Sequence, residues 1–110
     1  MAEIIWTVPA FNDLDQITDY IALDKVNAAI KLADKIFDKV KRLAEFPESG
    51  RLLPELDNDK YREIIVQPCR ILYYIEDDKV YVTHVMRSER QLRRYMLEDV
   101  IHEKPSKYTT

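Results

Sequence analysis

The fold is decided by residues 61–86, which read YREIIV-QPC-RILYYI-EDDK-VYVTHVM. Residues 61–66, 70–75 and 80–86 are runs rich in β-branched and aromatic side chains, and each run is bounded by a short polar or proline-containing break. Runs of this composition are typical of β-strands, and consecutive strands with short connections pair antiparallel. The stretch therefore predicts a three-stranded antiparallel meander.

A strand and two helices are predicted ahead of this meander. Residues 4–8, IIWTV, read as a short strand that Pro9 ends. Phe11, Leu14, Ile17 and Ile21 then recur at helical spacing, with acidic residues between them, which predicts an acidic amphipathic helix. A longer helix follows, and its expected core-facing stripe consists of Val26, Ala29, Ile30, Ala33, Ile36, Phe37, Val40, Leu43 and Ala44.

The predicted elements define an α+β fold. Helices joined by only a few residues form an antiparallel hairpin, and this hairpin is the available cover for one face of the sheet. A polar loop is expected from Arg51 to Lys60, and a short C-terminal helix is expected after the last strand. We expect a single domain over residues 1–110, with its core at about 4–96 and a flexible tail at 103–110.

Composition excludes several classes of protein. The single glycine, Gly50, excludes a Gly-rich phosphate loop or a dinucleotide-binding turn, so we expect no cofactor. No Cys/His cluster has metal-ligand spacing, so no metal site is expected. The apolar runs are too short to cross a bilayer, and residues 1–3 do not begin a secretion signal. Together with a lone cysteine, Cys69, these features favour the cytoplasm.

Charge is distributed unevenly along the chain. Residues 1–60 carry 8 basic and 12 acidic side chains, residues 61–95 carry 7 and 5, and residues 96–110 carry 2 and 3. The local sums of −4, +2 and −1 give the net charge of −3. Six of the seven basic residues in the middle segment are arginine, which binds phosphate and carboxylate in bidentate fashion. This segment is therefore where we expect a functional surface.

Four stretches of the chain carry a family resemblance, in the same order as in that family. Together they cover roughly residues 4–92 and resemble the RelE/ParE superfamily, the toxins of type II toxin–antitoxin modules. The stretches are WTVPA at 6–10 with Asp13-Leu14, Gly50-Arg51 with PEL at 54–56 and YREI at 61–64, CRILYY at 69–74, and VYVTHVMRSERQL at 80–92.

The resemblance implies a toxin that is encoded beside a partly disordered antitoxin, which neutralises it. RelE-like members cut mRNA in the ribosome, using basic side chains on the sheet and a late tyrosine. ParE-like members lack that set and inhibit DNA gyrase. The two branches therefore imply different partners, and the site residues decide between them.

The residues favour the ParE-like branch. Arg70 and Arg90 match RelE arginines, and Arg62 and Tyr95 are weaker candidates for the same catalytic set. The lysine pair expected on the strand before Arg70 is missing, and no convincing general base is present. A pI near 5.4 also disfavours docking into an RNA cage. A ribosome-dependent, metal-independent endoribonuclease remains the alternative.

Antitoxin binding is common to both branches. We expect an amphipathic antitoxin helix along the helical hairpin or the sheet, with acidic antitoxin residues at the arginine cluster. The residues expected to contact partners are Phe11, Leu14, Arg87, Arg90, Arg93 and Arg94. Structural roles are weighed against these. Arg70 is equally compatible with a sheet residue paired to a carboxylate. His84 is interpreted as an ordinary strand histidine, and Cys69 as a small turn residue and not a nucleophile.

Overall fold

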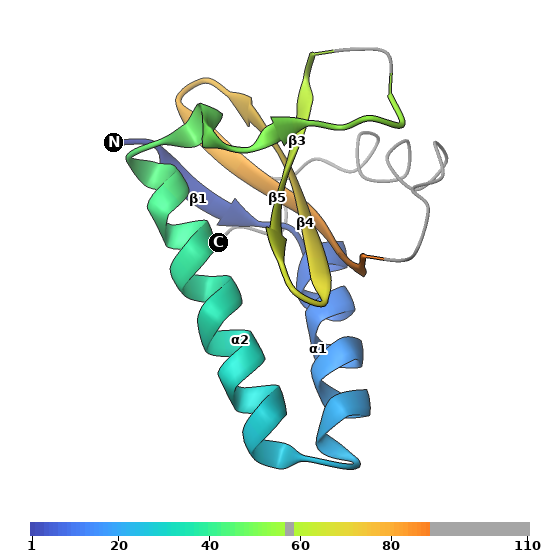
Figure 1. The fold of residues 1–110 in the computed structure, drawn as a ribbon. Helices are drawn as coiled ribbons and strands as arrows, with labels where there is room; N and C mark the ends of the chain where they lie inside the picture. The colour runs from blue at the N-terminus through green and yellow to red at the C-terminus, as the bar shows by residue number, and fades with distance from the viewer. Residues whose placement is uncertain (57–58, 89–110) are drawn as a thin grey trace.

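A computed structural model describes residues 1–56 and 59–88 of the chain (Figure 1). Two short 3₁₀ turns, Arg42–Ala44 and Pro47–Ser49, connect the helical part to the sheet. The longer elements are β1 (Glu3–Trp6), α1 (Val8–Ala22), α2 (Val26–Lys41), β2 (Arg51–Leu52), β3 (Tyr61–Val66), β4 (Cys69–Glu76) and β5 (Lys79–Arg87).

The described strands form one sheet in the order β1-β5-β4-β3-β2. The antiparallel meander β3-β4-β5 predicted from the sequence is confirmed. The N-terminal strand β1 pairs in parallel with β5, so the first strand forms one edge of the sheet, next to the last described strand. The parallel pairing was not predicted, because its two partners lie more than seventy residues apart and carry no shared turn signal.

The hairpin between β4 and β5 has a two-residue loop at Asp77 and Asp78. Both residues have positive φ angles, 52° and 60°, as a type I′ turn requires. Aspartate tolerates this left-handed region better than most residues, since its short side chain hydrogen-bonds locally. The predicted turn is therefore present, and Glu76 pairs with Lys79 across its base.

The helical hairpin covers one face of the sheet, as predicted. In Figure 1 the two helices lie side by side, and their connecting turn projects beyond the strands. Thr7 links β1 to α1: its hydroxyl donates to the Val82 carbonyl at 2.8 Å and accepts from the Ala10 amide at 3.4 Å. This N-cap satisfies a helix-terminal N–H and anchors the start of α1 to β5.

The predicted core stripe of α2 is partly wrong. Val26, Ile30 and Phe37 are exposed, whereas Leu32, which the prediction left out, is buried at 6 % exposure. The stripe that faces the sheet consists of Ala29, Leu32, Ile36, Val40 and Leu43. These residues are separated by three or four positions, so they form one narrow line, and the exposed apolar residues lie on its flank.

The segment predicted as a polar loop, Arg51 to Lys60, also contributes to the structure. Its first residues form the short strand β2, and Leu53 is buried with an exposed fraction of 2 %. Leu53 packs with Tyr61, Leu72, Tyr74 and Met86 on the face of the sheet opposite the helices. The sheet is therefore buried on both faces, which explains why Tyr73 and Tyr74, on opposite faces, are both core residues.

Gly50 occupies a tight backbone passage that has no room for a side chain. A Cβ atom there would lie 2.5 Å from the Tyr73 hydroxyl and 2.6 Å from the Glu63 carbonyl oxygen. The Tyr73 hydroxyl accepts from the Gly50 amide at 2.9 Å and donates to the Pro47 carbonyl at 2.6 Å. The lone glycine of the chain is thus placed where the backbone passes directly over a buried tyrosine.

The predicted C-terminal helix and tail fall in residues 89–110, outside the described part of the chain. Among the described helices, none combines the length and apolar character that crossing a bilayer requires.

Candidate functional site

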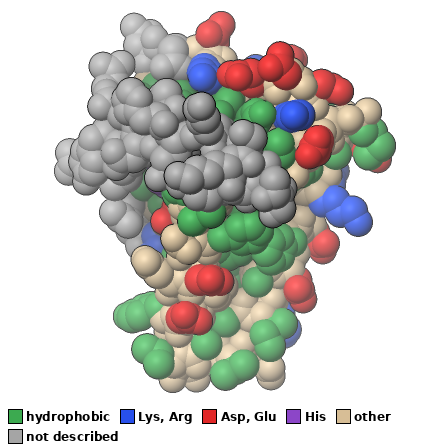
Figure 2. All heavy atoms as spheres, turned by 180° about the vertical axis from the view of Figure 1, so that it is seen from behind, with side chains coloured by type: hydrophobic (Ala, Val, Ile, Leu, Met, Phe, Trp, Pro, Cys, Tyr) green, Lys and Arg blue, Asp and Glu red, His purple; other side chains and the backbone are tan. Residues whose placement is uncertain are grey.

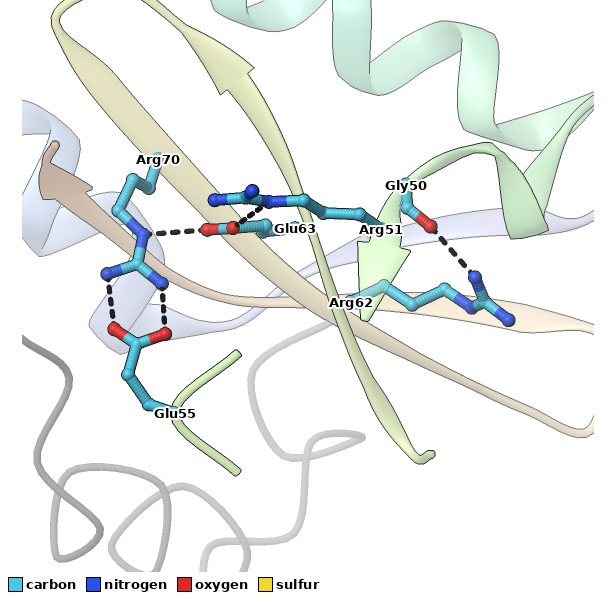
Figure 3. Close-up of polar contacts among 6 residues, drawn as sticks. All are labelled: Gly50, Arg51, Glu55, Arg62, Glu63 and Arg70. Carbon is cyan, nitrogen blue, oxygen red and sulfur yellow. Dashed lines mark hydrogen bonds and ion pairs between the residues drawn. The ribbon is translucent and has the colours of Figure 1, made fainter. Parts of the chain in front are cut away.

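Arg70 lies at the start of β4, on the face of the sheet opposite the helices (Figure 3). Its side chain is 7 % exposed and is held by two carboxylates. Nε donates to Glu63 Oε1 at 2.6 Å, and the two terminal nitrogens donate to the Glu55 carboxylate at 2.6 and 2.8 Å. A bidentate pair and a second charged hydrogen bond therefore engage all three nitrogens of the guanidinium.

Glu63 is the buried centre of this group. The residue is 1 % exposed, and its second oxygen, Oε2, accepts from Arg51 Nε at 2.5 Å. The hydrogen bonds that Arg70 donates to Glu55 and Glu63 raise the pKa of Arg70 above its ordinary value, although burial acts in the opposite direction. We call Arg51, Glu55, Glu63 and Arg70 the arginine–glutamate cluster. It contains two cations and two anions, so it is neutral overall.

Arg62 is directed away from this cluster. It neighbours Glu63 in β3, so its side chain leaves the opposite face of the sheet. Its Nη1 donates to the Gly50 carbonyl at 2.8 Å (Figure 3). The same nitrogen donates to the Glu48 carbonyl at 3.2 Å. Arg62 and Arg70, both candidates for RNA cleavage, therefore do not converge on one point.

Three of the other predicted site residues lie in the part of the chain that the structure describes, and four lie outside it. Arg87 ends β5 and is half-buried opposite Cys69 in the sheet register. Leu14 is 4 % exposed and packs in the core, so the isolated chain does not present it to a partner. Phe11, by contrast, is 43 % exposed. Arg90, Arg93, Arg94 and Tyr95 lie outside the described residues.

The two carboxylates of the cluster were missed as functional partners of Arg70. Glu63 carried a signal: it shares strand parity with buried Tyr61, and it is the sheet neighbour of β4 residues near Arg70. An acidic residue at such a position needs a cation, since an unpaired buried charge is costly. No feature of the sequence indicated Glu55, because it lies in an irregular segment whose approach to Arg70 depends on the tertiary fold.

His84 and Cys69 both contribute to the fold. Asp13 of α1 lies 3.1 Å from His84 Nδ1 and accepts from the Val85 amide at 3.1 Å, which ties α1 to β5. Cys69 is buried as the first residue of β4, so it belongs to a strand and not to the predicted turn. Within residues 1–56 and 59–88, no group of three or more His, Cys, Asp or Glu side chains is placed to bind a metal.

A second candidate surface lies on the helical layer. Trp6 stacks on Phe11 with ring centroids 5.2 Å apart and contacts Phe37 of α2 at the same separation. Phe37 is 41 % exposed, and Ile30, seven residues earlier on the same side of α2, is 54 % exposed. We call Trp6, Phe11, Ile30 and Phe37 the aromatic face. Figure 2, the view from behind, shows a continuous hydrophobic area over the helical layer with acidic side chains around it.

Comparisons with known proteins agree with this architecture. Residues 4–92 match the family described as the ParE toxin of the type II toxin–antitoxin system, parDE. The chain is 34% identical over 91 residues to Toxin RelE2 of Caulobacter vibrioides, covering 82% of this chain and 99% of that protein. A solved structure titled "Chromosomal ParDE TA system from P. aeruginosa" aligns with a TM-score of 0.68 at 25% identity, covering 81% of this chain and 98% of that one.

Proposed function

Because the chain belongs to the ParE toxin family of type II toxin–antitoxin systems, we propose that it inhibits DNA gyrase when its antitoxin is absent. Inhibition of gyrase requires the toxin to bind a protein target and requires no catalytic site on the sheet. It also assigns the cytoplasm as the place of action, since that is where bacterial DNA is supercoiled.

The engagement of Arg70 is the observation that supports this proposal. Cleaving RNA without a metal requires cations that stabilise the charge developing on the phosphate. All three Arg70 nitrogens already bind carboxylates, and the side chain is 7 % exposed. A phosphate would have to displace Glu55 and leave that anion without its bidentate partner. Arg70 therefore serves the fold, and Arg51, the cation beside it in the described sheet, is bound by the same Glu63 carboxylate.

The aromatic face is the surface that we assign to the antitoxin. Exposed aromatic side chains supply large apolar area at a small entropic cost, and they are enriched in protein interfaces. Phe11 and Phe37 come from different helices and both contact Trp6, so they form an exposed apolar surface of the kind that the apolar side of an amphipathic helix covers. Arg87, with Arg90, Arg93 and Arg94, remains proposed as a contact for acidic antitoxin residues.

A supercoiling assay tests the gyrase assignment. Relaxed plasmid is incubated with gyrase, ATP and increasing amounts of the purified chain, and topoisomerase I relaxation serves as the control for general DNA effects. We expect supercoiling to be lost at stoichiometric excess and to return when the protein encoded by the neighbouring gene is added. Undiminished supercoiling, with growth still arrested in cells, would contradict the assignment.

The surface assignment has its own test. Phe37→Asp should prevent co-purification with the protein encoded by the neighbouring gene, because it places a charge inside a buried apolar contact. Leu52→Asp is the matched control, since Leu52 is similarly exposed at 43 % but lies on the sheet edge. Equal loss of binding in both variants would show that the aromatic face is not the specific contact.

The endoribonuclease alternative has one observation in its favour, which is the name of the relative from Caulobacter vibrioides. It predicts codon-positioned mRNA cuts that depend on Arg70 and Arg90. Primer extension after induction reads such cuts directly. We expect none above background, and cuts that disappear in Arg90→Ala would establish the alternative.

A further inference from the structure

Three exposed cations form a row along one side of the helix α2 and its end. Lys35 and Lys39 lie on α2, and Arg42 follows the last residue of that helix with helical backbone angles, φ −66° and ψ −19°. The three are separated by four and then three positions, so they lie on the same side of the helix. We call Lys35, Lys39 and Arg42 the basic stripe.

The basic stripe borders a depression between α2 and β3. One hollow of about 510 Å³ and a second of about 460 Å³ are both lined by Lys39, Arg42 and Ile65. Because the two hollows share these residues, they are neighbouring parts of one depression. Lys35 and the exposed Gln67 line the second hollow. All three cations are therefore accessible from the same side of the molecule.

The charge of the basic stripe is only partly offset. Asp38 is the one exposed acidic residue that lines the depression, because the other, Glu63, is buried and bound by two arginines. Within residues 1–56 and 59–88, none of the ion pairs involves a member of the basic stripe. A chain whose net charge is −3 therefore presents unpaired positive charge at this place.

A regular row of cations matches a ligand whose negative charges are also regularly spaced. Seven positions separate Lys35 from Arg42, which is about 10 Å along a helix axis. Each strand of duplex DNA carries a phosphate about every 3.4 Å along the duplex axis. The row therefore spans about three phosphate steps, so that each cation can pair with a different phosphate.

We propose that the basic stripe binds the phosphate backbone of duplex DNA, and that the toxin uses it to contact the DNA held by gyrase. The second part rests on the proposed function, because it names a further component of the same complex. Gln67 lines the same depression and can donate from its side-chain amide to a phosphate oxygen. Such contacts reach no base edge, so we expect binding to be independent of DNA sequence.

The position of the basic stripe supports this assignment. Phe37 of the aromatic face and Lys39 are two positions apart, which is about 200° around the helix, so an antitoxin helix on that face leaves the stripe open. The acidic remainder of the surface repels DNA, which favours the one orientation that turns the stripe toward the duplex. A flexible acidic peptide would have to be ordered to match the row, whereas a duplex presents its phosphates already fixed.

The salt dependence of DNA binding tests the inference. Fluorescence anisotropy of a short labelled duplex is followed as the chain is added at several salt concentrations. Three phosphate contacts predict a slope of about −2.7 for the logarithm of the binding constant against that of the salt concentration. Binding should thus weaken about 40-fold between about 50 and 200 mM salt. A labelled, end-capped oligoglutamate peptide is the control for attraction of any anion, and we expect it to bind more weakly.

Two double variants locate the contact. Lys39→Gln with Arg42→Gln should reduce the slope to about −0.9 and weaken duplex binding about tenfold or more. Lys25→Gln with Lys41→Gln removes the same charge at exposed positions off the stripe and should change neither value. Backbone amide shifts of the ¹⁵N-labelled chain on addition of the duplex should centre on residues 35–42 and Gln67, and the first double variant should lose them.

Several results would overturn the inference. These are no binding of the duplex at low salt, equal slopes in the two double variants, binding of oligoglutamate as tight as that of the duplex, or amide shifts centred elsewhere. The supercoiling assay gives a separate readout. If the parent chain leaves gyrase active but binds the duplex through the stripe, the proposed function fails and the DNA contact stands. If it inhibits gyrase without binding the duplex, the reverse holds.

Discussion

Two groups of basic side chains lie on either side of β3, and the fold uses them in opposite ways. In the arginine–glutamate cluster, Arg70 is nearly buried and binds two carboxylates. Across the strand, Lys35 and Lys39 of α2 and Arg42, which follows the last residue of α2, are exposed beside β3. Each basic side chain carries the same formal charge in both places, but only those of the second group are unburied and available to a partner. Burial and pairing therefore decide which basic residues carry function.

The largest expected effect comes from breaking the buried group at its centre. Glu63→Gln removes the charge that holds both Arg70 and Arg51, so it should lower the free energy of unfolding by about 3 kcal/mol or more. Urea denaturation followed by circular dichroism measures this change. Glu45→Gln, at an exposed carboxylate, is the control and should change little. A loss below about 1 kcal/mol for Glu63→Gln would contradict the structural role of the cluster.

An intermediate effect is expected at the rim of the same cluster. Glu55 makes two hydrogen bonds to Arg70, but its side chain is 23 % exposed. Water can replace part of what it provides, so Glu55→Gln should cost about 1.5 kcal/mol in the same experiment. The cost should shrink in high salt, which screens the more accessible pair. A cost equal to that of Glu63→Gln would show that burial does not determine how much each carboxylate of the cluster contributes to the free energy of unfolding.

The smallest effect on stability is expected on the other side of β3. Lys39→Gln and Arg42→Gln remove exposed charges, so each should change the free energy of unfolding by less than about 0.5 kcal/mol. Thermal melts of both variants beside the parent chain measure this. A marked destabilisation would mean that these cations, like Arg70, are used within the fold, and the contrast between the two groups would disappear.

The sequence predicted the elements that have strong local signals. The meander was readable because its three strands are rich in β-branched residues and the Asp77–Asp78 loop has turn chemistry. The helical hairpin was predicted from the helical spacing of its apolar residues. The buried face of α2 could not be predicted, because Ile30 and Leu32 are equally apolar and only the position of the sheet selects Leu32 for burial.

The candidate site was less accessible to sequence reasoning. Arg70 was identified as a residue of interest, with carboxylate pairing as one of its readings, but the pairing partners lie 7 and 15 residues away in sequence. The strand β2 contains only Arg51 and Leu52, too short for any periodic pattern. The strand β2 pairs only with Arg62 and Glu63 of β3, and how much of that strand it covers follows from the tertiary structure alone.

The central claim is that the Arg70 guanidinium is fully engaged within the fold. Side-chain ¹H–¹⁵N spectra of the arginine Nε–H groups, recorded while inorganic phosphate is added, test it most directly. The account predicts that the Arg70 Nε–H signal exchanges slowly with water and does not move as phosphate increases. A saturable shift of that signal, with faster exchange as Glu55 is displaced, would show that the cluster opens to phosphate and would contradict the account.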